Sequence, residues 1–326
     1  MTHDDDLDPL DQAWDLIAEG DLAGALASAL ESLRDDEDSP EGHNVVGYVY
    51  AMEGNLEQAL RHYLHALSVD DGFLDALLNA TDVLIQLGET ERALGLLEDA
   101  LDVAESPEER AEALLLQVDA LLSAGRREEA AEVVGTLPDG PFENPQLDFL
   151  VGRARFEVGD LEGAAPLLEL AARRPGAHGD AHYYRALVLE ERDDPAGMAA
   201  AFVQCRDADL EAPRPAWAEP IPVFERRVGQ ALRRLPRRFA DRLEGALVIV
   251  DDVPGAELVS EGFDPRAVAL VEEVELPRRS GDPVRLCRVF VYQRNAERAA
   301  GAQDRMDDEL LAALQHEMSQ AFPEDR

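Results

Sequence analysis

The chain has 326 residues, with no lysine, 30 arginines and 69 acidic residues, so its formal net charge at pH 7 is −39. Phosphates would be repelled by such a chain, which excludes nucleic acids and anionic membranes as partners. Apolar residues make up 46% of the chain and aromatic residues only 6%, a balance that supports packed cores and favours helices over a large sheet.

The N-terminus and the cysteines bear on the compartment of the protein. Residues 1–6 are polar and acidic and lack the apolar run of a signal peptide, and no stretch of 18 apolar residues could cross a membrane. Cys205 and Cys287 are too few for a disulfide framework, so we expect buried free thiols. The sequence therefore predicts a cytoplasmic protein.

The acidic charge is concentrated in the first two thirds of the chain. Residues 1–215 carry a net charge of −34, whereas residues 216–326 carry only −5. Four prolines between residues 213 and 222 exclude a helix or a central strand there. We therefore expect three segments: an all-helical domain over 1–210, a linker over 211–222 and a second domain over 223–326.

A short pattern recurs through the first domain: a glycine, a few polar residues, and then an alanine that opens an apolar stretch. The glycines are Gly20, Gly54, Gly88, Gly125 and Gly159, and a decayed sixth copy begins near Asp193. The spacings are nearly constant at 34, 34, 37, 34 and 34, and this period predicts an array of helix–turn–helix repeats. Each glycine would end a helix in the left-handed conformation, and each alanine would lie where two helices approach closely.

The pattern resembles the tetratricopeptide repeat family over residues 9–209. The second copy has the family's residues at Gly47, Tyr50, Gly54, Ala59, Tyr63 and Ala66. The resemblance implies about six repeats, twelve helices, and a concave groove in which the first helices of the repeats bind peptides. The fourth repeat is three residues longer, and we place the additional residues in a turn at 104–109.

The groove positions that the resemblance implies are mostly acidic and aromatic. They are Glu41, Asn44, Tyr48, Asp75, Asp82, Glu112, Asp119, Phe149, Arg153, Phe156, Asp180 and Tyr183, followed by Glu190 and Glu191. The family's carboxylate clamp needs lysine, arginine and asparagine, so an acidic C-terminal tail is not the expected ligand. Acids mixed with aromatic rings suit a basic or arginine-rich protein or peptide partner. The alternative is a solvated acidic face without a specific ligand.

The last third of the chain predicts a small α+β domain, which makes the overall fold class α+β. Helical patterns cover residues 224–235, 237–243 and 306–322, and strand patterns cover 246–250, 268–271 and 285–292. The first helical segment is rich in arginine, with Arg226, Arg227, Arg233 and Arg234. We expect this basic segment to dock against the acidic surface of the repeats.

The final helix contains the sequence His316-Glu317-Met318-Ser319-Gln320. In the H-E-x-x-H signature, two histidines hold zinc and the glutamate activates the zinc-bound water. Together with the segments 248–254 and 289–294, this sequence resembles a bacterial minimal zincin-like metallopeptidase family over about residues 223–326. The resemblance implies that His316 is a metal ligand and Glu317 the catalytic base.

The departures from that family concern the metal ligands. Gln320 replaces the second histidine, and Arg326 occupies the position of the third ligand. Because catalytic zinc needs three protein ligands, we expect no cofactor and an interaction scaffold with an inactive metallopeptidase-like domain. The alternative is a zinc-dependent metallopeptidase with a divergent site. In that case His316 and Glu317 would belong to a zinc centre with unrecognised ligands. If the domain is inactive, they are either a relic pair that serves packing or a weak site with another use.

Overall fold

The computed structural model describes residues 8–243, 245–276 and 284–323. Its contacts divide the chain into two compact units, residues 1–171 (the first unit) and 172–326 (the second unit). This division falls before the last helix pair of the predicted repeats, because those two helices pack with C-terminal residues. The domain boundaries expected from the charge and the prolines stay a prediction. No described helix is long and apolar enough to cross a membrane.

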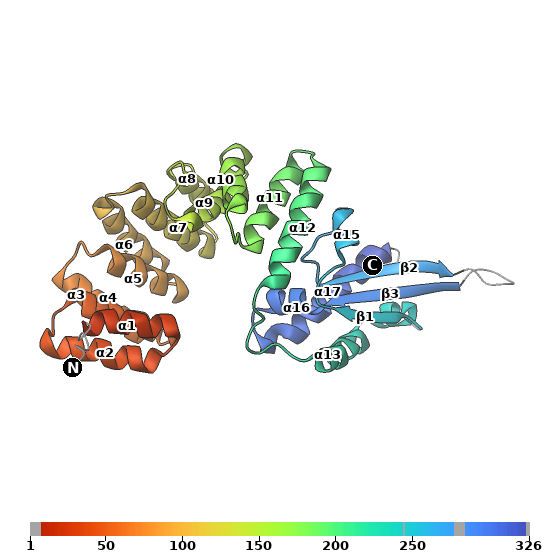
Figure 1. The fold of residues 1–326 in the computed structure, drawn as a ribbon, viewed down its shortest axis with the longest axis horizontal. Coiled ribbons are helices and arrows are strands. Elements are labelled where there is room, and N and C mark those ends of the chain that lie inside the picture. Colours follow the sequence, from red (N-terminus) through yellow and green to blue (C-terminus); the bar gives the residue numbers. More distant parts are fainter. Residues whose placement is uncertain (1–7, 244, 277–283, 324–326) are drawn as a thin grey trace, which may run out of the picture. The chain divides into compact units, whose positions relative to one another are not determined.

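Twelve helices follow one another in six pairs between Pro9 and Glu211, as the repeat pattern predicts (Figure 1). They are α1 (Pro9–Glu19), α2 (Leu22–Asp35), α3 (Pro40–Met52), α4 (Leu56–Val69), α5 (Leu74–Gln86), α6 (Thr90–Val103), α7 (Pro107–Ser123), α8 (Arg127–Val134), α9 (Pro145–Glu157), α10 (Leu161–Arg173), α11 (Gly179–Glu191) and α12 (Pro195–Glu211). In the first unit, α1 contacts α3, α3 contacts α5, α5 contacts α7, and α7 contacts α9. The first helices of successive repeats therefore form one continuous layer.

The repeat glycines turn the chain between the two helices of each pair. All five have a positive φ between 74° and 87°, which only glycine adopts without strain. The alanines that follow them, Ala25, Ala59, Ala93, Ala130 and Ala164, are completely buried. Gly47 shows how close the helices come, because an added Cβ would lie 2.7 Å from Cε1 of Tyr63. The predicted roles of these residues in packing are thereby confirmed.

The sixth copy keeps the left-handed turn without its glycine. Asp193 stands at the glycine position and has a φ of 58°. We expect Asp193→Gly to stabilise the second unit by about 0.5–1 kcal/mol, since it removes the strain of a side chain in this region. Asp193→Ala should destabilise it by a similar amount. Urea denaturation followed by Trp217 fluorescence in a Trp14→Phe background, where Trp217 is the only tryptophan, measures both. A glycine variant less stable than the parent would contradict this account.

The additional residues of the fourth repeat do not lie in a turn. Helix α7 has 17 residues, whereas α3, α5 and α9 have 13 each, and α7 extends further at its N-terminal end. Ser106 and Glu109 cap this end reciprocally, each side chain bonding the backbone N–H of the other residue at 3.1 Å. The expectation of a longer turn at 104–109 is therefore wrong, because a capping box starts the helix early.

The C-terminal residues of the second unit form a mixed three-stranded sheet with helices, which confirms the predicted α+β class. The elements are α13 (Ile221–Arg234), α14 (Arg237–Arg242), β1 (Leu247–Asp251), α15 (Ala256–Ser260), β2 (Ala269–Leu276), β3 (Val284–Tyr292), α16 (Gln293–Ala300), η1 (Gln303–Arg305) and α17 (Met306–Ala321). The strand order is β1-β3-β2, with β1 parallel and β2 antiparallel to β3. Phe224 of α13, Val289 of β3 and Leu314 of α17 are completely buried in their common core.

Two arginines of α13 have partners inside their own unit. Arg227 pairs with Glu219 at 2.5 Å and also with Asp307. Arg234 lies 3.7 Å from Asp308 at the start of α17. The structure thus assigns these two side chains to the packing of α13 on α17, whereas the sequence suggested the acidic repeat surface.

Candidate functional site

The candidate groove residues occupy recurring positions of the first helix in each repeat. An acid stands thirteen positions before the repeat glycine in Glu41, Asp75 and Glu112. The tenth position before the glycine holds Asn44, Leu78, Leu115 and Phe149, and the sixth position before it holds Tyr48, Asp82, Asp119 and Arg153. Because these positions are three and four apart, they share one face of each helix.

At the N-terminal end of this face, an aromatic pair joins the first two repeats. Trp14 of α1 packs on Tyr48 of α3 with their ring centroids 5.3 Å apart, and Trp14 is 42% exposed. Sequence reasoning missed Trp14, although it stands at the sixth position before Gly20, as Tyr48 does before Gly54. Repeat periodicity was the signal that could have found it.

Asn44 does not face a partner. It is buried, and its Oδ1 accepts a hydrogen bond of 3.0 Å from Nδ2 of Asn79 on α5. This bond joins two neighbouring first helices in the interior. Asn44 is therefore a structural residue of the helix layer, and its assignment to the groove is corrected.

Carboxylates gather along α5, α7 and α9. Burial raises the pKa of Glu112, and repulsion from Asp75 raises it further. Burial also raises the pKa of Asp119, with Glu157 and Asp82 adding to the effect and Arg153 opposing it. These acids are ionised at a free-energy cost in the free protein. A cation bound beside them would reduce that cost.

A cavity of about 250 Å³ lies between α7 and α9 on this acidic face. Its lining residues are Glu112, Leu115, Leu116, Val118, Asp119, Asn144, Leu147, Leu150, Arg153, Ala154 and Glu157. Arg153 partly balances the charge, with its Nε 3.6 Å from Oε1 of Glu157 and its guanidinium carbon 5.9 Å from the centroid of the Phe149 ring. Apolar side chains thus form much of the wall, with three carboxylates and one guanidinium among them. Phe149 and Phe156 are both half-buried on α9.

The sequence pointed to Glu112, Asp119 and Arg153 but not to the apolar wall of the cavity or to Glu157. Leu115 shares its repeat position with Phe149, so periodicity again contained a signal. The leucines of α9 gave no such signal, because a leucine in the core and a leucine that lines a cavity recur at the same helical spacing.

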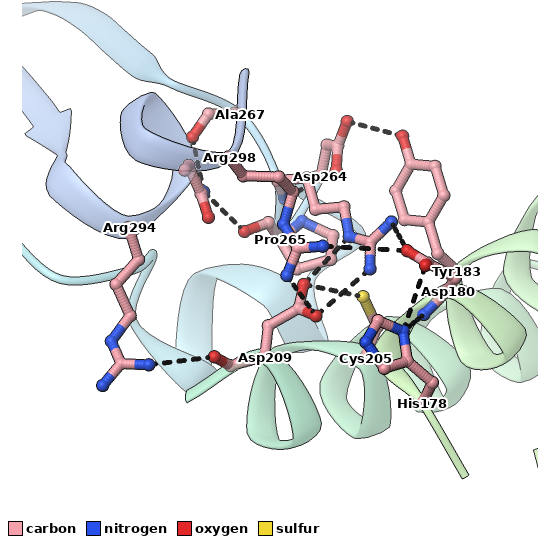
Figure 2. A network of polar contacts seen from close by, with 12 residues as sticks. His178, Asp180, Tyr183, Cys205, Asp209, Asp264, Pro265, Ala267, Arg294 and Arg298 are labelled. Atoms are coloured by element: carbon pink, nitrogen blue, oxygen red, sulfur yellow. Dashed lines mark hydrogen bonds and ion pairs between the residues drawn. The ribbon is translucent and has the colours of Figure 1, made fainter. Parts of the chain in front are cut away.

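Asp180 and Tyr183 lie in the second unit, where the chain's own C-terminal residues engage them (Figure 2). Nη1 of Arg266 lies 2.7 Å from Oδ1 of Asp180, and the guanidinium carbon of Arg266 lies 4.6 Å from the centroid of the Tyr183 ring. The hydroxyl of Tyr183 donates a hydrogen bond of 3.1 Å to Asp264. Residues of the same chain therefore already occupy the polar groups of Asp180 and Tyr183.

Asp209 is the centre of the same network (Figure 2). It is 6% exposed, and its carboxylate accepts bonds of 2.9 and 3.1 Å from Nε and Nη2 of Arg266. Nη2 of Arg298 lies 2.5 Å from the same carboxylate. The adjacent thiol of Cys205 is free and buried, as expected, and burial raises its pKa to about 12, which makes it unreactive. The network fastens α11 and α12 to the C-terminal residues.

The residues around His316 do not fit a catalytic zinc site. His316 and Gln320 lie on an exposed part of α17, and Glu317 is half-buried. Burial raises the pKa of Glu317, against the opposing effects of His316 and the backbone of Val271. Within the residues that the structure describes, no group of three or more histidine, cysteine, aspartate or glutamate side chains could hold a metal ion. Arg326 lies outside the described residues.

Paired helices with a left-handed turn at a nearly constant spacing define a helical-repeat protein. The family model of the tetratricopeptide repeat matches residues 10–71 and 78–141, which therefore contain tetratricopeptide repeats. These matches lie outside residues 223–326, so they give the metallopeptidase resemblance no support.

Solved structures of other proteins are similar to this chain. PilF of Pseudomonas aeruginosa is 17% identical and aligns over 63% of this chain and 91% of its own, with a TM-score of 0.52, which shows a common fold. PilW, a type IV pilus biogenesis factor, is 15% identical over 63% of this chain and 93% of its own, with a TM-score of 0.49. YrrB, a tetratricopeptide repeat protein with an unusual peptide-binding site, is 16% identical over 56% and 93%, with a TM-score of 0.41. No curated protein matches the chain.

Proposed function

We propose that this protein is an interaction scaffold that binds a basic protein segment on the first helices of its repeats, from α3 to α9. Tetratricopeptide repeat proteins mediate protein–protein interactions, and residues 10–141 contain such repeats. The observation that supports the proposal most directly is the cavity between α7 and α9, where leucines meet the carboxylates of Glu112, Asp119 and Glu157. Apolar walls with a few charged groups are typical of binding sites.

The negative charge of the proposed groove favours a positively charged partner. Asp82 and Asp119 stand at the same position of successive repeats. The two carboxylates repel each other in the free protein, and this repulsion adds to the effect of burial in raising the pKa of Asp119. A basic segment would convert this repulsion into attraction and would also be steered by the negative first unit.

The alternative function, a zinc-dependent metallopeptidase with a divergent site, finds no support in the described geometry. One exposed histidine supplies at most one ligand, and Gln320 is a poor one. The contacts of Arg266, Arg294 and Arg298 with α11 and α12 support a different role for the C-terminal residues. They cover the last repeat, as terminal capping elements do in repeat proteins.

Removing two groove charges should weaken binding of a basic peptide. We expect Asp82→Asn combined with Asp119→Asn to raise the Kd of a labelled arginine- and leucine-containing peptide about tenfold, since each lost charge contributes about 0.5–1 kcal/mol. Fluorescence anisotropy at ionic strengths from about 0.05 to 0.5 M would show affinity falling steeply with salt.

The matched control removes two acids elsewhere. Asp99→Asn combined with Asp102→Asn changes the net charge equally on exposed positions of α6. This control should change the Kd less than about twofold. Equal weakening by both double variants would mean non-specific attraction, and affinity that does not depend on salt would exclude the electrostatic account.

A further inference from the structure

The sixth repeat shows what its groove positions bind. Asp180 stands thirteen positions and Tyr183 ten positions before Asp193, which occupies the glycine position. The guanidinium of Arg266 contacts both residues. Its Nη1 lies 2.7 Å from Oδ1 of Asp180, and its central carbon lies 4.6 Å from the centroid of the Tyr183 ring. Figure 2 shows Asp180 and Tyr183 together on the helix that faces the C-terminal residues. An arginine is thus bound by an acid and the flat side chain one turn further along the helix.

The fifth repeat, in the first unit, has the aromatic ring and the guanidinium of this arrangement but not the acid. Phe149 stands at the same position as Tyr183, ten positions before Gly159. The guanidinium of Arg153 lies over the Phe149 ring at 5.9 Å and near Glu157. Both aromatic residues at this repeat position therefore have a guanidinium over the ring, although the two arginines come from different parts of the chain.

The third and fourth repeats present the same acid without an arginine. Asp75 and Glu112 stand thirteen positions before their glycines, and Leu78 and Leu115 follow one turn later. Among the residues that the structure describes, none forms a hydrogen bond or an ion pair with the carboxylate of Asp75 or Glu112. Glu112 and Leu115 both line the cavity between α7 and α9. The chain therefore offers two positions of this kind to a partner.

We propose that the groove selects arginine over lysine, and that its partner is an arginine-bearing segment whose guanidinium groups lie on Asp75 and Glu112 against Leu78 and Leu115. This inference rests on the proposed function. A guanidinium is planar, donates along a fork that matches a carboxylate, and is weakly hydrated, so it packs on apolar side chains. The ammonium of lysine is a strongly hydrated point charge and gains less from such a surface.

The test compares two labelled peptides of equal length and charge, in which every third residue is either arginine or lysine and the remainder are leucine and glycine. At an ionic strength of about 0.15 M we expect the full-length protein to bind the arginine peptide at least about fivefold more tightly. Asp75→Asn combined with Glu112→Gln should bring the two Kd values together. Asp99→Asn combined with Asp102→Asn should leave the ratio unchanged.

Each outcome separates this inference from the proposed function. If both peptides bind equally and the groove variants weaken both, the groove binds basic segments but does not select arginine. If the preference for arginine survives in the Asp75→Asn, Glu112→Gln variant, other residues produce it and the assignment is wrong. If neither peptide binds, the proposed function itself fails. Circular dichroism spectra equal to those of the parent protein establish that the variants are folded.

Discussion

Asp209→Ala is expected to destabilise the second unit by about 3–5 kcal/mol, because it leaves two guanidinium groups without their shared buried carboxylate. Asp209 accepts from Arg266 at 2.9 and 3.1 Å and lies 2.5 Å from Arg298. The Arg266 side chain is only 13% exposed, so water cannot replace the lost partner fully. Asp180 remains beside Arg266 and limits the loss.

The measurement is urea denaturation of the Trp14→Phe protein, in which Trp217 reports on the second unit alone. Trp217 packs against the core of that unit, so its fluorescence follows unfolding of the C-terminal residues. The control is Asp207→Ala, two positions away on α12, where the carboxylate is 59% exposed and pairs with Arg206. A surface pair of this kind contributes less than about 1 kcal/mol. Equal losses for the two variants would contradict a central role of Asp209.

Ala59→Leu should destabilise the first unit by about 1–3 kcal/mol through overpacking. Ala59 is completely buried in a cluster with Tyr63, Ala80 and Val83, and three additional carbon atoms have no space there. The same urea experiment with Trp14 as the only tryptophan, in a Trp217→Phe background, follows the first unit. The comparison is Ala27→Leu, an exposed position on α2, which should change stability by less than about 0.5 kcal/mol. An unchanged midpoint for Ala59→Leu would contradict the repeat register.

The helices of the repeats could be predicted because their signals are local and recur. Gly54 and Ala59 stand in the same relation to each other as Gly88 and Ala93, so five copies support each assignment. Even the decayed copy was located from its spacing, and in the structure Asp193 has the positive φ of the repeat glycines. The three strands of the second unit were found from their apolar patterns, although β2 extends further than the predicted 268–271.

Two expectations from the sequence were wrong because a local interaction or a packing contact determined the position of the residues. A capping box at Ser106 drew the additional residues of the fourth repeat into α7. Asn44 was assigned to the groove from its repeat position, but a hydrogen bond with Asn79 holds it in the interior. The position of a residue within the repeat does not predict either hydrogen bond, because each bond depends on which other polar group lies within reach.

The sequence by itself determined that residues 9–211 form an array of helical repeats with a nearly constant period, that this part of the chain is strongly acidic, and that a small α+β region follows it. Periodicity and charge are properties of neighbouring residues, so they can be read along the chain. Only the tertiary structure decided which of the candidate groove positions are engaged by the chain itself. Asp180 and Tyr183 have the same pattern as their counterparts, yet Arg266, which lies far along the chain from both, occupies them. Such a contact depends on how α11 and α12 pack against the C-terminal residues, and a distant partner leaves no trace in the spacing of the repeat.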